Sequence, residues 1–211
     1  MAKNHTISRR DFIKVVSLVG SGFAIGFNSI QASRDTLSKF SPNMFINILN
    51  DDTVILSVSK AEMGQGVWTS LPMLIAEEME VEWSKIEIQQ ASNDNFMGTG
   101  GSMSISGYGW EKMRKAGAVA KYMLIEAAAL DWRVSPIECV AKKSVVYHDK
   151  TGKSTTFGSL VEKASKIKIP RKVRLKDPSD FTIIGNDMPR TDSLMKVNGT
   201  ATFSMDVKLD N

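Results

Sequence analysis

The chain has 211 residues, of which 42% are hydrophobic and 24% are charged. These proportions exclude a disordered or collagen-like protein and fit one or two small globular domains. The formal net charge is +4, and no basic block is interleaved with aromatic residues, so we expect no nucleic-acid partner.

The first 32 residues have the order of a signal peptide: a basic segment, a short apolar segment and then small polar residues. Arg9 and Arg10 give the basic segment a twin-arginine pattern, and the apolar segment 15–27 is short for a membrane span. We therefore predict export to the periplasm in the folded state, a route often taken by proteins that acquire a cofactor first. The alternative is an ordinary helix that begins with two arginines. Residues 30–33 form a weak cleavage site, so a retained membrane anchor stays open.

Residues 40–170 are predicted to form an α+β domain in which small mixed sheets are packed by helices. Short runs rich in β-branched residues indicate strands at 45–49 and 54–58, and the polar turn 50–53 between them indicates a hairpin. Alternating apolar residues within 81–89 indicate a third strand.

The helices of this domain are predicted from apolar spacing. One helix is expected over 67–79, where Pro72 falls early enough to be tolerated. A polar loop rich in Gly, Ser and Asn follows over 92–109. A long helix is then expected over 110–132, because its apolar residues recur at alternating spacings of three and four.

The next segment begins with Ser135, Pro136 and Glu138, the pattern of a helix start with a capping box. Two short runs on either side of 149–153 predict a small hairpin, and 157–167 a short helix. Cys139 is the single cysteine and cannot form an internal disulfide or hold a cluster by itself. The two histidines, His5 and His148, lie far apart in the sequence, so no histidine metal site is expected.

Residues 171–199 form a polar connector, and 200–209 alternate like a strand. We expect residues 200–211 to be the start of a second domain. A strand without a partner would leave its backbone groups unpaired. The sequence therefore predicts a chain cut short within that domain.

A glycine-rich turn, Met63-Gly64-Gln65-Gly66, lies between a predicted strand and a predicted helix. Two glycines let a ligand approach the backbone closely, and the helix start beyond them offers free N–H groups to an anion. Gln65 can donate a hydrogen bond without carrying charge. The alternative is a tight turn with a solvated glutamine.

A second glycine-rich segment, residues 98–106, lies ahead of the long helix and includes Gly100, Gly101 and Ser102. Glycines with hydroxyl side chains can cradle a phosphate. The segment is not a Walker loop, because no Gly-Lys-Ser/Thr follows it. The alternative is a flexible surface loop.

Three ordered blocks carry a resemblance to the molybdopterin-binding large subunits of the xanthine dehydrogenase/aldehyde oxidase family, in their isoquinoline 1-oxidoreductase beta-subunit branch. The first runs Lys-Ala-Glu-Met-Gly-Gln-Gly-Val-Trp-Thr-Ser-Leu-Pro-Met from Lys60 and continues to Glu78. The second joins residues 100–102 to 110–118. The third spans Leu175 to Ala201 and includes Arg190.

This resemblance implies a molybdenum–molybdopterin cofactor in its cytosine dinucleotide form. It places Gln65 beside the molybdenum as a catalytic residue that hydrogen-bonds an oxo ligand. Gly64 and Gly66 would let the pterin come close, and residues 100–102 would contact the dinucleotide.

The implied reaction is the oxidative hydroxylation of aldehydes or N-heterocycles, with water as the oxygen source. Electrons would pass to a separate iron–sulfur small subunit, which suits a chain with one cysteine. A cytochrome is a further candidate partner.

Two departures from the family accompany the resemblance. Its members are several times longer, and their general base is a glutamate near the far C-terminal end, to which no residue here corresponds. Glu62, Glu77 and Glu78 are not substitutes, and we expect Glu77 and Glu78 on a solvated helix face. Residues 200–209 resemble the opening of a hammerhead-like domain. We therefore expect a fragment that needs its missing C-terminal portion, or alternatively an exported, non-catalytic binding or assembly module.

Overall fold

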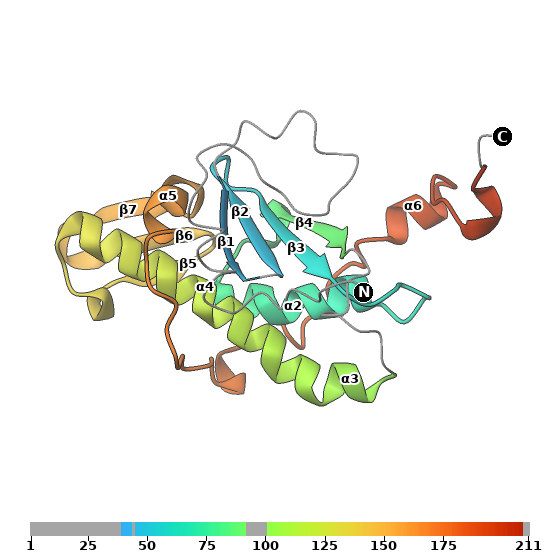
Figure 1. Cartoon of the computed structure of the whole chain (residues 1–211), viewed down its shortest axis with the longest axis horizontal. Helices are drawn as coiled ribbons and strands as arrows, with labels where there is room; N and C mark the ends of the chain where they lie inside the picture. Colours follow the sequence, from blue (N-terminus) through green and yellow to red (C-terminus); the bar gives the residue numbers. More distant parts are fainter. Residues whose placement is uncertain (1–38, 44, 92–100, 209–211) are drawn as a thin grey trace, which may run out of the picture.

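The computed structural model describes residues 39–43, 45–91 and 101–208. The predicted leader lies outside these ranges. The first sheet has the strand order β1-β2-β3-β4 (Figure 1). Its strands are β1 (Lys39–Asn43), β2 (Ile46–Leu49), β3 (Val54–Val58) and β4 (Ile86–Gln90).

The first three strands are antiparallel neighbours, whereas β4 runs parallel to β3. The expected hairpin is confirmed as β2–β3, in which Ile48 lies opposite Val54. A parallel pair needs a crossover connection, and α2 (Val67–Met79) provides it, over the residues predicted to be helical. The segment 81–89 was expected to be strand, but it contains a 3-10 turn, Trp83–Lys85, before β4 begins.

Two helices, α2 and α4 (Tyr108–Trp132), cover one face of this sheet (Figure 1). They pack closely because Gly117 lies at their contact, where an added Cβ would be 2.4 Å from the carbonyl oxygen of Ile75. The short helix α3 (Met103–Ser106) precedes α4 within the segment expected to be a loop. The fully buried apolar side chains come from both helices and the sheet, among them Ile46, Ile48, Leu56, Ile75, Met79 and Leu124.

The second sheet lies at the C-terminal end of α4 (Figure 1) and has the antiparallel order β5-β6-β7. Its strands are β5 (Val140–Lys142), β6 (Val145–His148) and β7 (Lys153–Thr156), and the last two form the expected hairpin. A 3-10 turn, Asp149–Thr151, connects them. This unit is tied to the first sheet because Asp52 Oδ1 accepts a 2.7 Å hydrogen bond from the backbone N–H of Gly158.

Several local predictions were wrong in detail. The strand β1 was not predicted. The Ser135 side chain makes no capping hydrogen bond, and Pro136–Glu138 form a 3-10 turn because β5 begins two residues later. Residues 157–167 form a 3-10 turn, Gly158–Leu160, and the one-turn helix α5 (Val161–Ala164) rather than one regular helix.

The expectation that Glu77 and Glu78 lie on a solvated face was also wrong. Their side chains are fully buried on α2, with 0% exposure. The cause is the segment 176–192, here called the strap, which lies over this part of α2 and supplies hydrogen-bond donors to both carboxylates. Helical periodicity cannot show that a distant polar segment covers a charged face.

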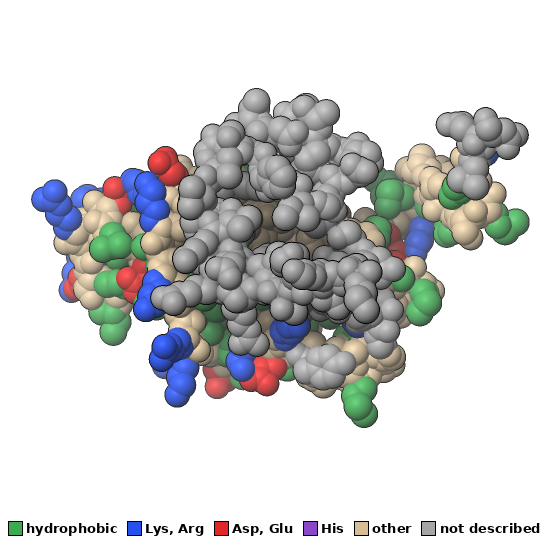
Figure 2. All heavy atoms as spheres, in the orientation of Figure 1, with side chains coloured by type: hydrophobic (Ala, Val, Ile, Leu, Met, Phe, Trp, Pro, Cys, Tyr) green, Lys and Arg blue, Asp and Glu red, His purple; other side chains and the backbone are tan. Residues whose placement is uncertain are grey.

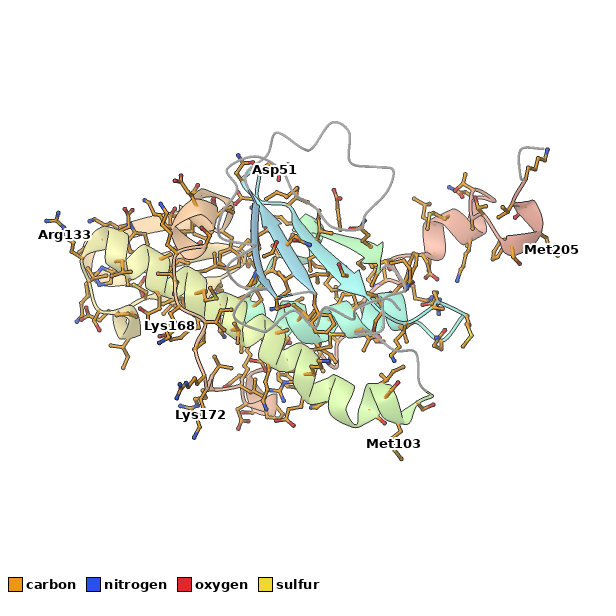
Figure 3. All side chains as sticks on the ribbon, viewed as in Figure 1. Asp51, Met103, Arg133, Lys168, Lys172 and Met205 are labelled. Atoms are coloured by element: carbon orange, nitrogen blue, oxygen red, sulfur yellow. The ribbon has the colours of Figure 1, made fainter. Side chains whose placement is uncertain are left out.

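The strand expected over 200–209 is absent from the described residues of that segment. The short helix α6 (Ser193–Val197) precedes it, and a 3-10 turn, Ser204–Asp206, lies within it; another 3-10 turn, Pro178–Asp180, lies in the strap. The described C-terminal residues project from the body, and Met205 is 95% exposed (Figure 3). Hydrophobic side chains are visible on the surface of this projecting C-terminal segment (Figure 2). A strand needs a neighbour to satisfy its backbone, and the described residues provide none here.

The molecule has the expected α+β architecture of small sheets packed by helices. Within the described ranges, none of the helices has the length and apolar character needed to cross a membrane.

Candidate functional site

The loop between β3 and α2 contains the predicted Gly64-Gln65-Gly66 turn. Gly64 has a φ of 104° and Gly66 a φ of 83°, both in the left-handed region that L residues avoid. Gly66 is also the N-cap of α2, the residue just before the helix. The two glycines therefore let the chain reverse sharply into the helix, which is the reason for this residue type at both positions.

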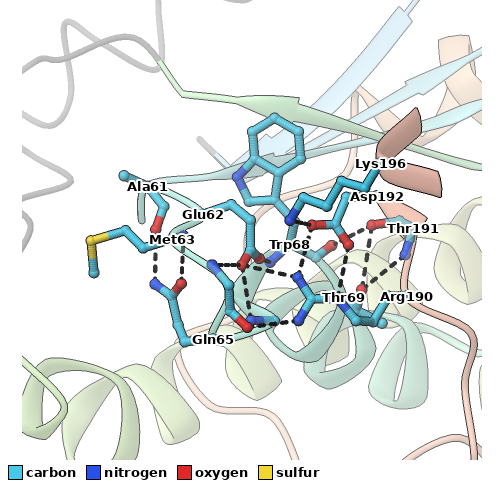
Figure 4. Close-up of polar contacts among 12 residues, drawn as sticks. Ala61, Glu62, Met63, Gln65, Trp68, Thr69, Arg190, Thr191, Asp192 and Lys196 are labelled. Atoms are coloured by element: carbon cyan, nitrogen blue, oxygen red, sulfur yellow. Dashed lines mark hydrogen bonds and ion pairs between the residues drawn. The ribbon is translucent and has the colours of Figure 1, made fainter. Parts of the chain in front are cut away.

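The carboxylate of Glu62 occupies the start of α2. Its Oε1 accepts hydrogen bonds from the backbone N–H groups of Gly64 at 2.8 Å and Gly66 at 3.0 Å, and its Oε2 accepts one from Trp68 at 3.2 Å (Figure 4). Burial would raise the pKa of Glu62, but these donors and Arg190 outweigh burial and hold the pKa below its usual value. We expected this helix start to offer free N–H groups to a bound anion; several of them serve an internal anion instead.

Gln65 is engaged within its own turn. Its Oε1 accepts a 2.6 Å hydrogen bond from the backbone of Met63, and its Nε2 donates a 2.8 Å bond to the carbonyl of Ala61 (Figure 4). An amide nitrogen has two donors, and among the described residues only one of them is engaged, so the second N–H of the exposed Gln65 side chain is open to a ligand. The side chain thus shapes the loop and also presents one uncharged donor.

A residue distant in sequence closes the loop from the other side. Arg190 Nη1 donates to the carbonyl of Gly64 at 2.8 Å, and Nη2 lies 3.2 Å from Glu62 Oε1 (Figure 4). The same guanidinium forms two hydrogen bonds with Asp192, at 2.9 and 2.8 Å. Sequence reasoning placed Arg190 in a matching block but gave it no role, because no local pattern predicts contact across 126 positions.

The Asp192 carboxylate completes this cluster. It also accepts from Lys196 at 2.5 Å, and its side chain is 4% exposed. The hydrogen bonds from Arg190 and Lys196 hold the pKa of Asp192 well below its usual range. The cluster thus contains two carboxylates and two cations, whose formal charges cancel.

The second predicted segment is only partly described. Gly100 lies outside the described residues, whereas Gly101 and Ser102 lie just before α3 and are exposed. Their carbonyls accept hydrogen bonds from residues 104–106, all within one local turn. None of these local bonds reaches the Gly64–Gly66 loop.

The described parts of the two glycine-containing segments leave room beside the backbone and lack a side-chain group that could hold a metal ion directly. A Cβ added at Gly64 or Gly101 would meet nothing within 4 Å, so the backbone is open on that side at both places. The described residues contain no group of three or more His, Cys, Asp or Glu side chains placed to hold a metal ion. The second N–H of the Gln65 amide is the donor of this loop that suits the hydrogen-bonding edge of a pterin, which itself would carry the metal.

The family model described as the molybdopterin cofactor-binding domain matches residues 3–209. The chain therefore belongs to the molybdopterin cofactor-binding family, and the predicted family is confirmed.

Two curated relatives resemble nearly the whole chain. The isoquinoline 1-oxidoreductase subunit beta of Brevundimonas diminuta is 28% identical, over 96% of this chain and 32% of that protein. The membrane-bound aldehyde dehydrogenase [pyrroloquinoline-quinone] of Gluconacetobacter polyoxogenes is 31% identical, over 97% of this chain and 28% of that protein. The chain thus spans about a third of the length of these relatives.

Among solved structures, the quinoline 2-oxidoreductase of Pseudomonas putida 86 aligns with 23% identity and a TM-score of 0.47. The alignment covers 55% of this chain and 15% of that one.

Proposed function

We propose that this chain is part of the cofactor-binding subunit of a molybdenum hydroxylase that oxidises aldehydes or N-heterocycles. The observation that carries the proposal is the family match over residues 3–209. The space beside Gly64, where an added Cβ would meet nothing within 4 Å, is consistent with it, because a ligand can approach the backbone there.

In this proposal the chain's own residues bind and orient the cofactor. Gly64 and Gly66 let the pterin approach the backbone, and Gln65 donates the amide N–H that its internal hydrogen bond leaves available. Residues 100–102 contact the dinucleotide, proposed to be the cytosine form. When bound, the molybdenum pterin supplies the two-electron oxidation of the substrate, with water as the source of oxygen.

The remaining functions are proposed to lie outside this chain. It spans about a third of its curated relatives, so the general base and most of the substrate pocket are assigned to the portion of the relatives beyond the match. An iron–sulfur subunit, and in some assemblies a cytochrome, would accept the electrons.

The proposal is tested by purifying the full chain, with any copurifying polypeptides, from a host that makes molybdopterin. Molybdenum is measured by mass spectrometry, pterin by the fluorescence of its oxidised form, and the nucleotide after acid release. We expect equal amounts of molybdenum and pterin, with cytidine monophosphate as the nucleotide. A purified chain free of both, or one carrying pyrroloquinoline quinone, would refute the cofactor assignment.

An activity assay distinguishes the enzyme subunit from the alternative, a non-catalytic binding or assembly module. The loaded protein with its copurifying subunits is assayed on an aldehyde and on quinoline with an artificial electron acceptor. Gln65→Ala should lower turnover or cofactor content, and Gln89→Ala, on β4, is the matched control. Because the general base is assigned outside this chain, cofactor binding without turnover would favour the module only in preparations that also contain the remaining portion of the subunit.

Export by the twin-arginine route is part of the same proposal. Replacing Arg9 and Arg10 with lysine should leave the chain in the cytoplasmic fraction, whereas replacing Arg171 and Arg174 with lysine should not. Periplasmic recovery of the Arg9→Lys, Arg10→Lys variant would rule this route out.

A further inference from the structure

The strap follows α2 from its C-terminal end to its N-terminal end. At the C-terminal end, the Glu77 carboxylate accepts from the backbone N–H of Ile183 at 2.6 Å and of Ile184 at 2.9 Å. At the N-terminal end, Thr191 N donates to Thr69 Oγ1 at 3.1 Å. The strap is therefore fixed at both ends of the helix that carries the Gly64–Gly66 loop.

We propose that the strap positions the Gly64–Gly66 loop for the cofactor, with Arg190 as the positioning residue. The inference rests on the proposed function, since it assigns the loop's shape to cofactor binding. Arg190 contacts the loop at two points: it donates a hydrogen bond to the carbonyl of Gly64 and another to the carboxylate of Glu62. A planar guanidinium can reach several acceptors at once, which no other side chain does with the same geometry.

Arg190 can do this only because it is itself held in place. The buried Asp192 carboxylate binds its Nε and Nη2 atoms in a two-point hydrogen bond. Lys196, from α6, binds the same carboxylate. A charge-assisted pair with two hydrogen bonds is both stronger than a neutral hydrogen bond and more restricted in orientation. The guanidinium of Arg190 is therefore held in one orientation toward the loop.

The loop in turn depends on Arg190 because its own bonds are local. Glu62 gathers the N–H groups of Gly64, Gly66 and Trp68, but these bonds leave the carbonyl of Gly64 without a restraint from the loop itself. Arg190 supplies that restraint from a segment outside the loop. A left-handed glycine turn has many accessible conformations, and the strap selects one of them.

The other end of the strap prevents it from shifting along the helix. Glu78 Oε1 binds Arg114 of α4 at 2.6 Å, and its Oε2 accepts from the backbone N–H of Lys176 at 2.9 Å. The Arg114 guanidinium also lies 5.0 Å from the ring centre of Phe181 in the strap. The register between strap and helix is therefore set well away from the loop.

The test compares Arg190→Gln with Arg171→Gln in the full chain. Both variants lose one positive charge, and Arg171 is an exposed residue preceding the strap. Hydrogen exchange is followed at the amides of Gly64, Gly66 and Trp68 and at core amides of α4. Molybdenum and pterin content are measured on the same preparations.

Exchange of a protected amide scales with the population of the opened loop. We expect Arg190→Gln to speed exchange at the loop amides on the order of tenfold, because a charge-assisted contact is lost. Core amides of α4 should exchange as in the unmodified chain, and cofactor content should fall. Arg190→Lys should be intermediate, because an ammonium keeps the charge but not the fork.

Unchanged loop exchange in Arg190→Gln would overturn the inference. An equal acceleration in α4 would also overturn it, since it would show a loss of overall stability only. If the loop amides exchanged faster in Arg190→Gln but the cofactor content stayed normal, cofactor binding would not depend on Arg190, and the positioning role would be rejected. If the unmodified chain held no molybdenum pterin, the proposed function would fail, while the exchange data would still decide whether the strap holds the loop.

Discussion

Replacing Glu77 with glutamine should destabilise the protein strongly although the shape of the side chain is kept. The carboxylate is completely buried and accepts from Thr182, Ile183 and Ile184 backbone N–H groups and from the Lys176 ammonium at 2.5 Å. A glutamine side chain replaces one acceptor oxygen with an amide donor, which would face these donors. The substitution thus removes the charge and leaves buried N–H groups without an acceptor.

The expected magnitude follows from these contacts. Removing one partner of a buried ion pair costs about 3–5 kcal/mol. We expect the lower end, ~3 kcal/mol, because Lys176 keeps its 2.9 Å ion pair with Glu80. With a urea m-value of about 2 kcal/mol/M, the unfolding midpoint should fall by ~1.5 M. Circular dichroism in a urea titration measures this shift.

A matched control is available on α5. Glu162→Gln makes the same chemical change at a side chain that is 83% exposed. It should alter the free energy of unfolding by less than about 0.5 kcal/mol. If Glu77→Gln lowered stability no more than Glu162→Gln, the carboxylate would not be what fastens the strap to α2. Unchanged hydrogen exchange at the amides of residues 182–184 would count against the reasoning in the same way.

Three further predictions concern pH, helix packing and the core. Burial opposes ionisation of Glu62 and Glu77, but their hydrogen bonds prevail and place both folded pKa values below the usual 4.5. On acidification the unfolded chain therefore binds protons before the folded chain does. The stability that these two groups contribute is present above about pH 4.5 and is lost as the pH falls below it. Between about pH 6 and pH 3.5, the urea midpoint of Glu77→Gln should therefore fall less than that of the unmodified chain. Gly117→Ala should lower the free energy of unfolding by ~2 kcal/mol, although alanine has the better helix propensity, because its Cβ would be 2.4 Å from the Ile75 carbonyl oxygen. Thermal unfolding measures this loss. A variant as stable as the unmodified chain, or more stable, would contradict the close contact. Phe157→Ala should cost about 3–5 kcal/mol in the same assay because the ring is 0% exposed, and a loss below 1 kcal/mol, roughly that of a surface change, would show that the site collapses around it.

The sequence predicted the elements whose signals are local. The β2–β3 hairpin and the helix over residues 67–79 were predicted because their signals, short apolar runs around a polar turn and helical spacing of apolar residues, depend only on neighbouring residues. The turn at Gly64 and Gly66 could be placed for the same reason. The three resembling blocks also identified the family, because they are ordered runs of residues within the sequence.

The predictions failed where distant segments meet. Residues 200–208 alternate like a strand, but the described residues offer no neighbouring strand to pair with. Ser135 has the residue type of a helix cap, yet the adjoining strand β5 leaves space for only a 3-10 turn.

The chain by itself therefore determined the family, the main helices and strands, and the position of the glycine loop, because each depends on the order of nearby residues. Tertiary structure alone decided that Glu62 fills the start of α2, that Glu77 and Glu78 are buried, and that Arg190 reaches the loop. The physical reason is that burial and ion pairing depend on which segments lie together in space. A carboxylate on a helix has the same sequence signature whether water or a strap covers it.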